Sequence, residues 1–452
     1  MTEHAPSRTR YVIVGTGSRA TMYVDAICGT YPDHCELAAL CDTSPPRAGY
    51  HNRRLAERYH RDEVPVYHAD DFGRMLAEQR PDVVIVTTVD AYHHQYIVAA
   101  LEHGCDAVSE KPMTVDADKA AAILSAVERT GGRLTVTFNY RYSPAYTRLR
   151  ELIAEGAIGT PHLVDFAWTL DTSHGADYFR RWHRERPMSG GLLVHKATHH
   201  FDLVNWWIGG WPATVSAMGS LSFYGSEAAG KRGEHYSYSR YTGQAGSDPF
   251  ALDLGRSPML RGLYLDAEEQ SGYLRDRNVF GTGISIEDTM VLAARYDTGA
   301  LLSYSLVAYS PWEGVRVAIT GDKGRVELYE RHGLHVIEDT PTGEAAAHGE
   351  VTQPERSIRL FPMFQSPVEI DIPDGGGPHG GDSAMLAQIF APSPPPDPWH
   401  RAASHLDGAA SVLLGVAANQ AIATGRPVDV ASLGVPLPAR PQAARAATRP
   451  AQ

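Results

Sequence analysis

The spacing of hydrophobic and polar positions changes near residue 140. Before that point, short apolar runs alternate with segments whose apolar residues recur at helical spacing, which is typical of a parallel sheet covered by helices. The predicted strands are 11–14, 36–41, 64–67, 82–87, 107–109 and 134–138, and the predicted helices include 47–59, 93–102 and 117–129. Residues 10–140 are therefore expected to form a nucleotide-binding domain, after a disordered lead at 1–9.

Beyond residue 140 the pattern has a different period. A predicted helix at 146–155 is followed by segments that alternate apolar and polar residues, at 215–223, 289–296, 300–308, 315–320 and 325–328. Such alternation indicates an antiparallel sheet with one solvated face. The predicted fold class is thus an α/β Rossmann domain plus an α+β domain with a large, mostly antiparallel open sheet, the second domain spanning 141–434.

Three further segments stand out by composition. Residues 224–285 are rich in Gly, Ser, Tyr and charge, and are expected to cover the substrate or to serve as an oligomer arm. Residues 392–398 read P-S-P-P-P-D-P, a stiff linker, before an apolar-periodic helix at 402–423. Residues 435–452 are expected to be a disordered tail.

Charge and cysteine content limit the function classes. The net charge of -12 disfavours a nucleic acid or an anionic membrane surface as partner, so a small molecule is the better candidate. The chain has no apolar run of about 18 residues, and its first residues lack the apolar core of a signal peptide, so a cytoplasmic protein is expected. The four cysteines have no metal-ligand spacing and are expected to be reduced.

The first predicted strand runs into a turn of small residues. Residues 11–20 read Y-V-I-V-G-T-G-S-R-A, with Gly15, Gly17 and Ala20 at the three small positions of a dinucleotide-binding turn. Gly15 would permit the tight turn, Gly17 would let the backbone approach a pyrophosphate, and Ala20 would let the next helix pack closely. Small residues also serve ordinary strand-to-helix turns, so this stretch alone leaves both readings open.

The second predicted strand is followed by Asp42. A carboxylate there can accept hydrogen bonds from both ribose hydroxyls of an adenosine and would repel a 2'-phosphate, which favours NAD over NADP. Asp42 lies farther from Gly15 than the usual spacing of about 20 residues, so the first helix and its loop must be long. Arg19 and Arg47 could instead hold a phosphate, which leaves NADP open.

A lysine follows the fifth predicted strand, in Ser109-Glu110-Lys111-Pro112. The carboxyl ends of parallel strands form the edge where open α/β sheets bind ligands. Pro112 holds the residue before it extended and could adopt the cis form, which would aim the ammonium group. A lysine desolvated beside a nicotinamide would have a lowered pKa and could donate or accept a proton, although these residues alone fit a surface turn better.

Seven motifs, in this order along the chain, resemble the glucose-fructose oxidoreductase / inositol dehydrogenase / MocA (Gfo/Idh/MocA) family. They are G-T-G-S-R-A at 15–20, Asp42, V-V-I-V-T-T-V-D-A-Y-H-H at 83–94, E-K-P at 110–112, N-Y-R-Y-S-P at 139–144, E-G-A-I-G-T-P at 155–161 and S-G-G-L-L-V-H-K-A-T-H-H-F-D at 189–202. The resemblance implies a tightly held nicotinamide and a sugar, cyclitol or glycoside substrate. It implies that Lys111 binds the reacting hydroxyl, that His199 is the catalytic histidine and that His93 packs near the cofactor.

The expected cofactor is NAD. The residues expected to bind it are Gly15, Thr16, Gly17, Ser18, Arg19, Ala20, Asp42, Arg47, Thr87, Thr88, His93, Glu110 and Lys111. A homo-oligomer, dimer or tetramer, is expected to assemble through the open sheet.

The chain departs from the family pattern at His195, where many members carry an aspartate. His195, His199 and Asp202 share one helical face, so Asp202 is expected to orient His199 while His195 lines the pocket. Two histidines four residues apart could also bind a metal, but Lys196 would repel Zn²⁺ and no third ligand is evident, so no metal is expected. The expected catalytic residues are Lys111, His199, His195, Lys196 and Asp202.

Residues 178–184, Y-F-R-R-W-H-R, combine aromatic faces with arginines. Such a cluster suits a sugar ring that carries a base, a carboxylate or a phosphate, but it also fits a solvated basic helix. The residues expected to bind substrate are Asn139, Arg141, Tyr178, Arg181, Trp182, His183, His195 and His200.

Three functions are compatible with these features. The first is NAD-dependent oxidation of a secondary alcohol of a sugar, cyclitol, glycoside or nucleoside. The second is a redox-neutral elimination, either dehydration or glycoside cleavage, in which hydride is removed and later returned. His195 and Lys196 motivate it, because elimination needs a second base and an acid. The third, a regulator that senses NAD without catalysis, is disfavoured by the proton-transfer residues.

Overall fold

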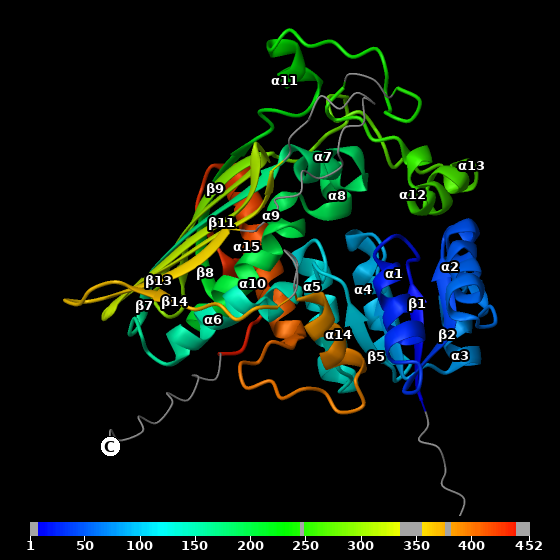
Figure 1. Ribbon diagram of the computed structural model, residues 1–452, viewed down its shortest axis with the longest axis horizontal. Helices are drawn as coiled ribbons and strands as arrows, with labels where there is room; N and C mark the ends of the chain where they lie inside the picture. Colours follow the sequence, from blue (N-terminus) through cyan, green and yellow to red (C-terminus); the bar gives the residue numbers. More distant parts are fainter. Residues whose placement is uncertain (1–7, 245–247, 335–354, 376–380, 440–452) are drawn as a thin grey trace, which may run out of the picture.

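The computed structural model describes residues 8–244, 248–334, 355–375 and 381–439. Two sheets organise the chain, one of seven strands and one of nine. Figure 1 shows the first domain in blue and cyan on one side of the molecule and the long strands of the second sheet on the other. The predicted fold class, a parallel Rossmann-like sheet with a second, mostly antiparallel open sheet, is confirmed.

The first sheet has the order β15-β6-β5-β4-β1-β2-β3, and all of its described pairs are parallel except β15 with β6. Its strands are β1 (Thr9–Val14), β2 (Cys35–Asp42), β3 (Val66–His68), β4 (Val83–Val86), β5 (Asp106–Ser109), β6 (Leu134–Val136) and β15 (Ala403–Ser404). Helices α1 (Ala20–Asp25), α2 (Pro45–Tyr59), α3 (Phe72–Gln79), α4 (His93–Glu102) and α5 (Ala117–Thr130) connect them. The strand order reverses between β1 and β4, and a ligand crevice is expected outside the carboxyl ends of these two strands.

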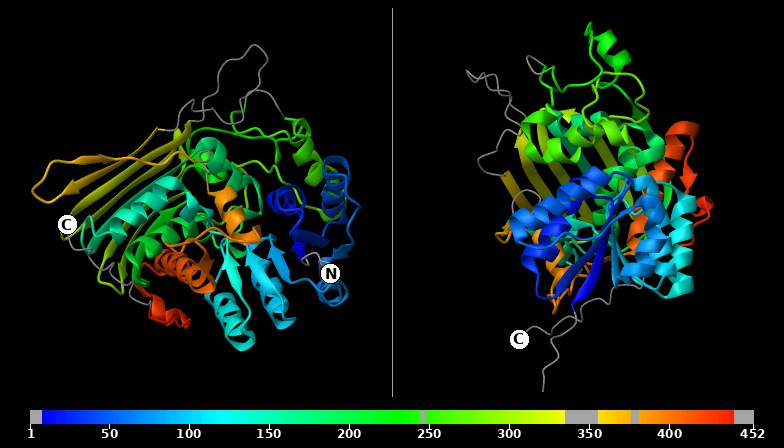
Figure 2. Two further views of the ribbon diagram at one scale, coloured as in Figure 1. Left: turned by 60° about the horizontal axis from the view of Figure 1, so that its bottom comes forward. Right: turned by 90° about the vertical axis from the view of Figure 1, so that its right-hand side faces the viewer.

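A late segment of the chain returns to the first domain. Strand β15 pairs with Val136 and Thr135 of β6, and Phe390 of α14 (Asp382–Phe390) packs its ring 5.0 Å from that of Tyr11. Figures 1 and 2 show the orange segment that carries α14 beside the cyan strands. The first domain is therefore completed by residues far beyond 140, because β6 needs a partner at its outer edge.

The second sheet has the order β14-β13-β12-β11-β7-β10-β9-β8-β16, with described neighbours antiparallel except β7 and β10. Its strands are β7 (Pro161–Asp171), β8 (Pro212–Ser220), β9 (Thr289–Tyr296), β10 (Leu301–Ser310), β11 (Trp312–Gly321), β12 (Gly324–Leu334), β13 (Glu355–Pro362), β14 (Val368–Ile370) and β16 (Val428–Asp429). Helices α6 (Pro144–Ala154), α10 (Ala197–Ile208) and α15 (His405–Thr424) share one core with it.

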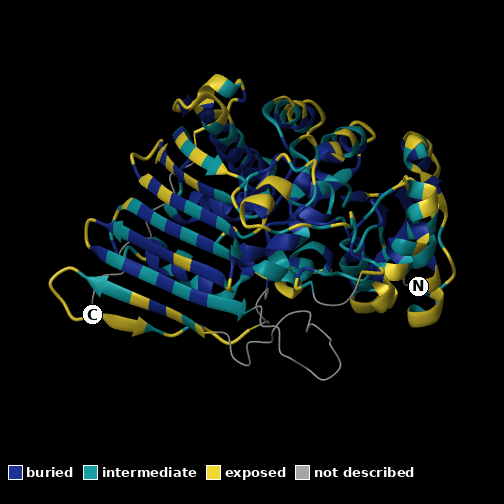
Figure 3. Cartoon of the chain, turned by 90° about the horizontal axis from the view of Figure 1, so that it is seen from above, coloured by how far each residue is buried: buried dark blue, intermediate teal, exposed yellow. Residues whose placement is uncertain are grey.

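The two faces of the second sheet differ in burial. Along β9 every second residue is buried, including Met290 and Leu292, whereas Val291 between them is 44% exposed. Figure 3 shows this alternation as bands of dark blue and yellow or teal across the strands. The inner face packs on the helices, and the outer face is open.

The segment at 224–285 reaches across to the first domain. It contains α11 (Ser226–Lys231), α12 (Pro258–Leu263) and α13 (Glu268–Ser271), and Figure 1 shows α12 and α13 next to α2. The Tyr264 hydroxyl accepts a hydrogen bond from the Ser18 N–H (3.0 Å), and Arg47 Nε donates to the Leu263 carbonyl (3.3 Å). The segment thus lies against the turn that follows β1.

The ends of the described chain correct two predictions. Thr9, predicted to be part of the disordered lead, opens β1 and donates to the His34 carbonyl (2.9 Å). Val435, predicted to begin a disordered tail, is 5% exposed, and the Pro438 carbonyl accepts from Trp211 Nε1 (2.9 Å). Apolar burial of Val435 explains why the chain stays packed there. The predictions for residues 1–7 and 440–452 lie outside the described residues.

Helix α15 is the most apolar long helix of the described chain. It is the one described helix long and apolar enough to cross a membrane, but 61% of that stretch is buried inside the protein. The Ser404 side chain and Asp407 form a capping box at its start. It is the core helix of the second domain, between the two sheets.

Candidate functional site

A cleft of about 920 Å³ opens at the carboxyl ends of the first sheet. Most predicted site residues line it: Gly15, Gly17, Ser18, Arg19, Asp42, Arg47, Thr87, Thr88, His93, Glu110, Lys111, Asn139, Tyr178, Arg181, Trp182, His183, His195, Lys196 and His199. Five predicted residues, all within the described chain, are not part of its wall: Thr16, Ala20, Arg141, His200 and Asp202. The fold thus brings together two motif groups that are far apart in sequence.

The turn after β1 has the shape that a dinucleotide requires. Gly15 has a φ of +88°, and a Cβ there would lie 2.5 Å from the Thr88 nitrogen, so no other residue fits without shifting the backbone. Ala20 is fully buried under the first sheet, which lets α1 start close to β1. Gly15, Gly17 and Ser18 line the cleft just before α1, so the residues present fit a dinucleotide whose pyrophosphate lies at the start of a helix.

Asp42 stands at the end of β2 with part of its carboxylate already in use. Oδ2 accepts from the Thr16 N–H (2.6 Å), and Oδ1 accepts from the Ser44 N–H (2.8 Å). Arg47 Nη1 lies 3.8 Å from Oδ1. The long spacing from Gly15 arises because α1 continues into a π-helical turn at Ala26–Thr30. The Asp42 carboxylate suits a ribose, whereas the neighbouring Arg47 suits a 2'-phosphate.

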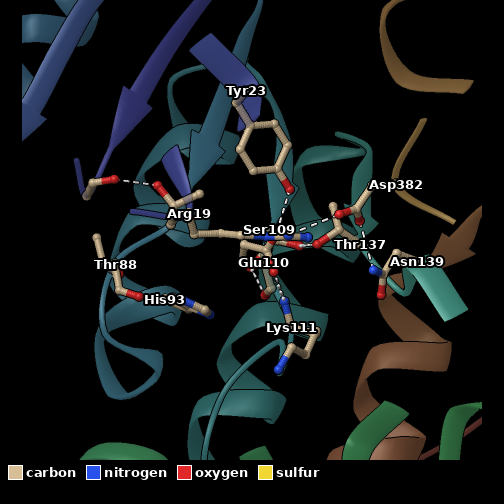
Figure 4. A network of polar contacts seen from close by, with 12 residues as sticks. Arg19, Tyr23, Thr88, His93, Ser109, Glu110, Lys111, Thr137, Asn139 and Asp382 are labelled. Atoms are coloured by element: carbon tan, nitrogen blue, oxygen red, sulfur yellow. Dashed lines mark hydrogen bonds and ion pairs between the residues drawn. The ribbon is translucent and has the colours of Figure 1, made fainter. Parts of the chain in front are cut away.

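Lys111 follows β5, and its bond to Pro112 is cis. Glu110 accepts from Arg19 Nε (2.6 Å) and from the Tyr23 hydroxyl (2.7 Å), and Figure 4 shows Glu110 held between them while Lys111 extends away. Lys111 Nζ lies 3.4 Å from the His195 carbonyl oxygen. Burial lowers the pKa of Lys111 to about 8, although Asp90 and Glu110 act to raise it. Glu110 therefore positions the lysine loop, and Lys111 is poised to exchange a proton near neutral pH.

The neighbouring loop is held in the same way. The buried ring of His93 bridges two carbonyl oxygens, with Nδ1 2.8 Å from Pro112 and Nε2 3.1 Å from Thr88 (Figure 4). Asn139 Nδ2 donates to Asp382 Oδ1 (2.8 Å), which comes from the returning α14. No sequence signal marked Asp382, because its partner Asn139 lies 243 positions away.

His195 has a carboxylate partner that the sequence did not reveal. Its Nδ1 lies 2.5 Å from Asp90 Oδ2, and both side chains are buried in the wall of the cleft. Burial, and then the cations Lys111 and Arg181, lower the pKa of His195 well below its ordinary value, while burial raises the pKa of Asp90. His195 is thus neutral, with Asp90 fixing Nδ1 and leaving Nε2 for a ligand. Asp90 belongs to a motif that matched the family, but no spacing rule linked it to His195.

His199 and Lys196 lie against Tyr140 in the same wall. The His199 ring stacks on the Tyr140 ring with a centroid distance of 4.2 Å. Lys196 Nζ donates to the Tyr140 hydroxyl (3.0 Å) and lies 4.7 Å from the centroid of the Trp168 ring. Burial, with the charges of Lys111 and Lys196, lowers the pKa of His199 well below its ordinary value. Two lysines and two neutral histidines therefore face one space.

Three predicted roles are corrected by the contacts. Asp202, predicted to orient His199, instead accepts from Nε (2.7 Å) and Nη2 (2.5 Å) of Arg141, a fully buried pair. Arg141, predicted to bind substrate, also pairs with Asp407 of α15 (2.9 Å). His200 is buried between Trp168 and Tyr304, whose hydroxyl lies 2.8 Å from its Nδ1. The helix α10 is buried on all sides, so its residues opposite the cleft bind other elements of the fold.

A second polar array reaches the cleft from the other sheet. His174 Nδ1 lies 2.9 Å from both carboxylate oxygens of Glu313, and its Nε2 lies 3.0 Å from the Tyr178 hydroxyl. His174 and Tyr178 lie on α7 (Thr172–Arg180), and both line the cleft. Their spacing of four residues on one helix could have suggested this pair, but Glu313 is 139 positions from His174.

Family models match both domains. One, described as the NAD-binding Rossmann fold of an oxidoreductase family (GFO_IDH_MocA), matches residues 9–138. The model of the C-terminal alpha/beta domain of the same family matches residues 150–430. The first domain is thus an NAD(P)-binding Rossmann domain.

Similar proteins cover the chain to different extents. YteT of Bacillus subtilis (strain 168) is 36% identical over 444 residues, which are 93% of this chain and 98% of YteT. D-glucoside 3-dehydrogenase of Escherichia coli (strain K12) is 29% identical over 217 residues, 48% of this chain and 58% of that protein. The structure of the WlbA dehydrogenase from Bordetella pertussis with NADH and UDP-GlcNAcA has a TM-score of 0.61 at 17% identity, with 94% of this chain and 99% of that one covered. At that identity the likeness concerns the fold alone.

Proposed function

Because the chain belongs to the Gfo/Idh/MocA family of oxidoreductases, we propose that it is an NAD-dependent enzyme that removes hydride from a secondary alcohol of a sugar, cyclitol, glycoside or nucleoside. One observation carries the proposal. Lys111, His195 and His199, from two domains, line the same cleft as the nucleotide turn. Relatives named as inositol 2-dehydrogenases and D-glucoside 3-dehydrogenase support the substrate class.

Different residues of the first domain bind different parts of the cofactor. The turn around Gly15 and Gly17 holds the pyrophosphate, and Asp42 accepts from the adenosine ribose, which favours NAD over NADP. Thr88 and His93 line the part of the cleft next to Lys111. A bound NAD would supply the hydride acceptor for the substrate carbon.

The chain's own residues move the hydroxyl proton. Lys111 in its neutral form takes that proton, because its lowered pKa of about 8 leaves much of it neutral at slightly alkaline pH. His195, oriented by Asp90, holds the same oxygen through Nε2, and His199 lines the same wall. Lys196 and Arg181 add positive charge, which stabilises the oxygen as negative charge develops on it.

Cofactor reduction tests the proposal. Purified protein is incubated with NAD and, one at a time, myo-inositol, methyl glucosides, free aldoses and nucleosides, and absorbance at 340 nm is followed. NADH formation in proportion to one compound is the expected result. A lack of NADH with every compound, together with a lack of NAD binding by calorimetry, would contradict it.

A second candidate is redox-neutral elimination, which the Tyr178–His174 array favours because elimination needs a base besides the one that serves the hydroxyl. In that reaction hydride is returned after the leaving group departs. Many turnovers of a glycoside without NADH accumulation would identify it, whereas one NADH per product would exclude it.

We also propose that the protein is cytoplasmic and forms a homo-oligomer, a dimer or tetramer, through the open face of the second sheet. That face carries the exposed apolar side chains Met218 (73% exposed), Val291 (44%) and Leu301 (42%). Met218 and Val291 line a hollow of about 1100 Å³ together with charged residues, among them Arg316, Glu327 and Arg359. Apolar side chains with charges of both signs around them fit a second copy of the same sheet. Light scattering of the Val291→Lys variant is expected to give a smaller particle than the parent protein, and an unchanged mass would contradict this interface.

A further inference from the structure

Tyr178 lies in the cleft with a chain of polar partners behind it that the oxidation of an alcohol does not require. Its side chain is 4% exposed and lines the same wall as His195 and Lys196. The partners behind it are His174 and then Glu313, which is also 4% exposed. Tyr178 and Glu313 are buried polar groups, so good hydrogen bonds are needed to offset the cost of removing them from water.

The hydrogen bonds offer a proton path through this array. Burial alone would raise the pKa of Glu313, but the charge and hydrogen bond of a protonated His174 lower it to about 2, so the carboxylate is ionised. In the neutral form of His174 this carboxylate accepts from Nδ1–H, and Nε2 is then the acceptor for the phenolic hydrogen of Tyr178. The lone pairs of the Tyr178 oxygen remain available to a ligand in the cleft.

The backbone holds the array in place. His174 and Tyr178 are one turn apart on α7, and Asp171 caps that helix by accepting from the N–H groups of Ser173 and His174. A Cβ on Gly175 would lie 1.8 Å from the Ala308 carbonyl oxygen, so α7 is seated directly on β10. A rigid helix on a sheet is a suitable support for a group that must meet a reacting atom.

Burial keeps Tyr178 protonated, and nearby positive charge opposes this effect only in part. Burial raises the pKa of Tyr178 to about 12, and the nearby Lys196 and Arg181 act in the opposite direction. The phenol thus stays protonated at neutral pH until His174 accepts its proton, and the imidazolium so formed is stabilised by Glu313.

We propose that Tyr178 is a second proton-transfer residue, which removes the C–H proton next to the carbonyl that oxidation creates, with His174 and Glu313 as positioning residues. This inference rests on the proposed function, since NAD must first take hydride from the alcohol carbon. The phenolic proton passes to His174 Nε2 as the Tyr178 oxygen takes the proton from carbon. The electron pair of that C–H bond becomes the C=C bond of an enolate, whose oxygen lies at Lys111. Reversal in D2O returns deuterium to the carbon.

Isotope exchange separates this step from hydride transfer. The compound that reduces NAD in the panel above is incubated with protein and NAD in D2O, and ¹H NMR follows the hydrogens next to the oxidised carbon. The parent protein is expected to exchange one of them. Tyr178→Phe is expected to slow the exchange at least about 100-fold, and to slow it far more than it slows single-turnover NADH formation. Tyr224→Phe, which removes a buried hydroxyl bonded to the Ala308 carbonyl, is the matched control and should exchange normally.

Other outcomes overturn the inference. Exchange that survives in Tyr178→Phe, or a parent protein that forms NADH without exchange, would show that Tyr178 moves no proton from carbon. Lys111→Met should lose NADH formation and exchange together. If only the Tyr178 step is wrong, NADH formation by the parent protein remains; if the proposed function is wrong, NADH formation is absent as well. The relay itself is tested without substrate by ¹⁵N NMR, where Tyr178→Phe and Glu313→Gln should each shift the His174 ring nitrogens. If the ¹⁵N shifts of His174 are the same in both variants as in the parent protein, the proposed hydrogen-bonded array would also be contradicted.

Discussion

The two ends of the cleft use their polar groups in different ways. At the nucleotide end, Asp42 and Glu110 each accept several hydrogen bonds from neighbouring residues, so their positions are set before any ligand arrives. At the other end, His195, Lys196 and Tyr178 have partners. In contrast, Nδ1 of His183 and Nδ1 of His199 are buried there with no hydrogen-bond partner among the described residues. Buried polar atoms usually have partners. The comparison indicates a preformed cofactor site beside a substrate site that a ligand completes.

The largest expected effect comes from Lys111, where the two ends meet. Lys111→Met should lower turnover by about 10⁴-fold while NAD binding, measured by calorimetry, changes little, because the nucleotide end keeps its own contacts. A variant that retains a tenth of the parent rate would contradict the role of this lysine as the base.

The pH profile of the parent protein sharpens the same claim. Since burial lowers the pKa of Lys111 to about 8, the neutral base is scarce below that pH and abundant above it. kcat/KM for oxidation should therefore rise about tenfold per pH unit below 8 and level off above it. A profile that is flat from pH 6 to 9 would contradict this assignment.

A substitution of Asp202 shows whether this residue serves the substrate end of the cleft or the core of the fold. Asp202→Ala leaves Arg141 buried with one carboxylate fewer, and should lower the free energy of unfolding by about 3–5 kcal/mol, as measured in urea. His199→Ala, its matched control on the same helix, should lose turnover with a smaller loss of stability. A stable Asp202→Ala protein with lost turnover would restore the predicted catalytic role of Asp202.

Asp90 tests whether the substrate end depends on an oriented histidine. Asp90→Asn keeps the shape of the side chain but weakens its hold on His195 Nδ1, and should reduce kcat by about 10²-fold with little change in NAD affinity. If kcat is equal in the variant and the parent protein, Asp90 does not orient His195 for catalysis and has only a structural role.

The smallest effect is expected at the nucleotide end. Asp42→Ala removes the acceptor for the ribose and should weaken NAD binding about tenfold. The preference of the protein for NAD over NADP should become smaller. Asp42→Asn is the control, because its amide oxygen can still accept from the Thr16 N–H. Equal affinity of the parent protein for NAD and NADP would contradict the proposed cofactor preference.

Local sequence patterns predicted the nucleotide end better than the substrate end. Each feature of the nucleotide end lies at or just after the end of a parallel strand, so a short stretch of sequence is enough to predict it. These features are the Gly15 turn, Asp42 and Lys111. Asp90, Glu313 and Asp382 were missed, since each meets its partner only through tertiary packing. The buried pairing of Asp202 with Arg141 was not anticipated, for a related reason. Helical spacing identifies a shared face but not the element that packs against it.

A crystal structure with NAD bound would show whether the two ends of the cleft act on one nicotinamide. We predict that the nicotinamide lies between Thr88 and Lys111, with its C4 facing a space bordered by Lys111 Nζ and the His195 ring. A substrate carbon there would be about 3–3.5 Å from C4. A nicotinamide that points away from these two side chains, or one whose C4 is closed off by the protein, would contradict it.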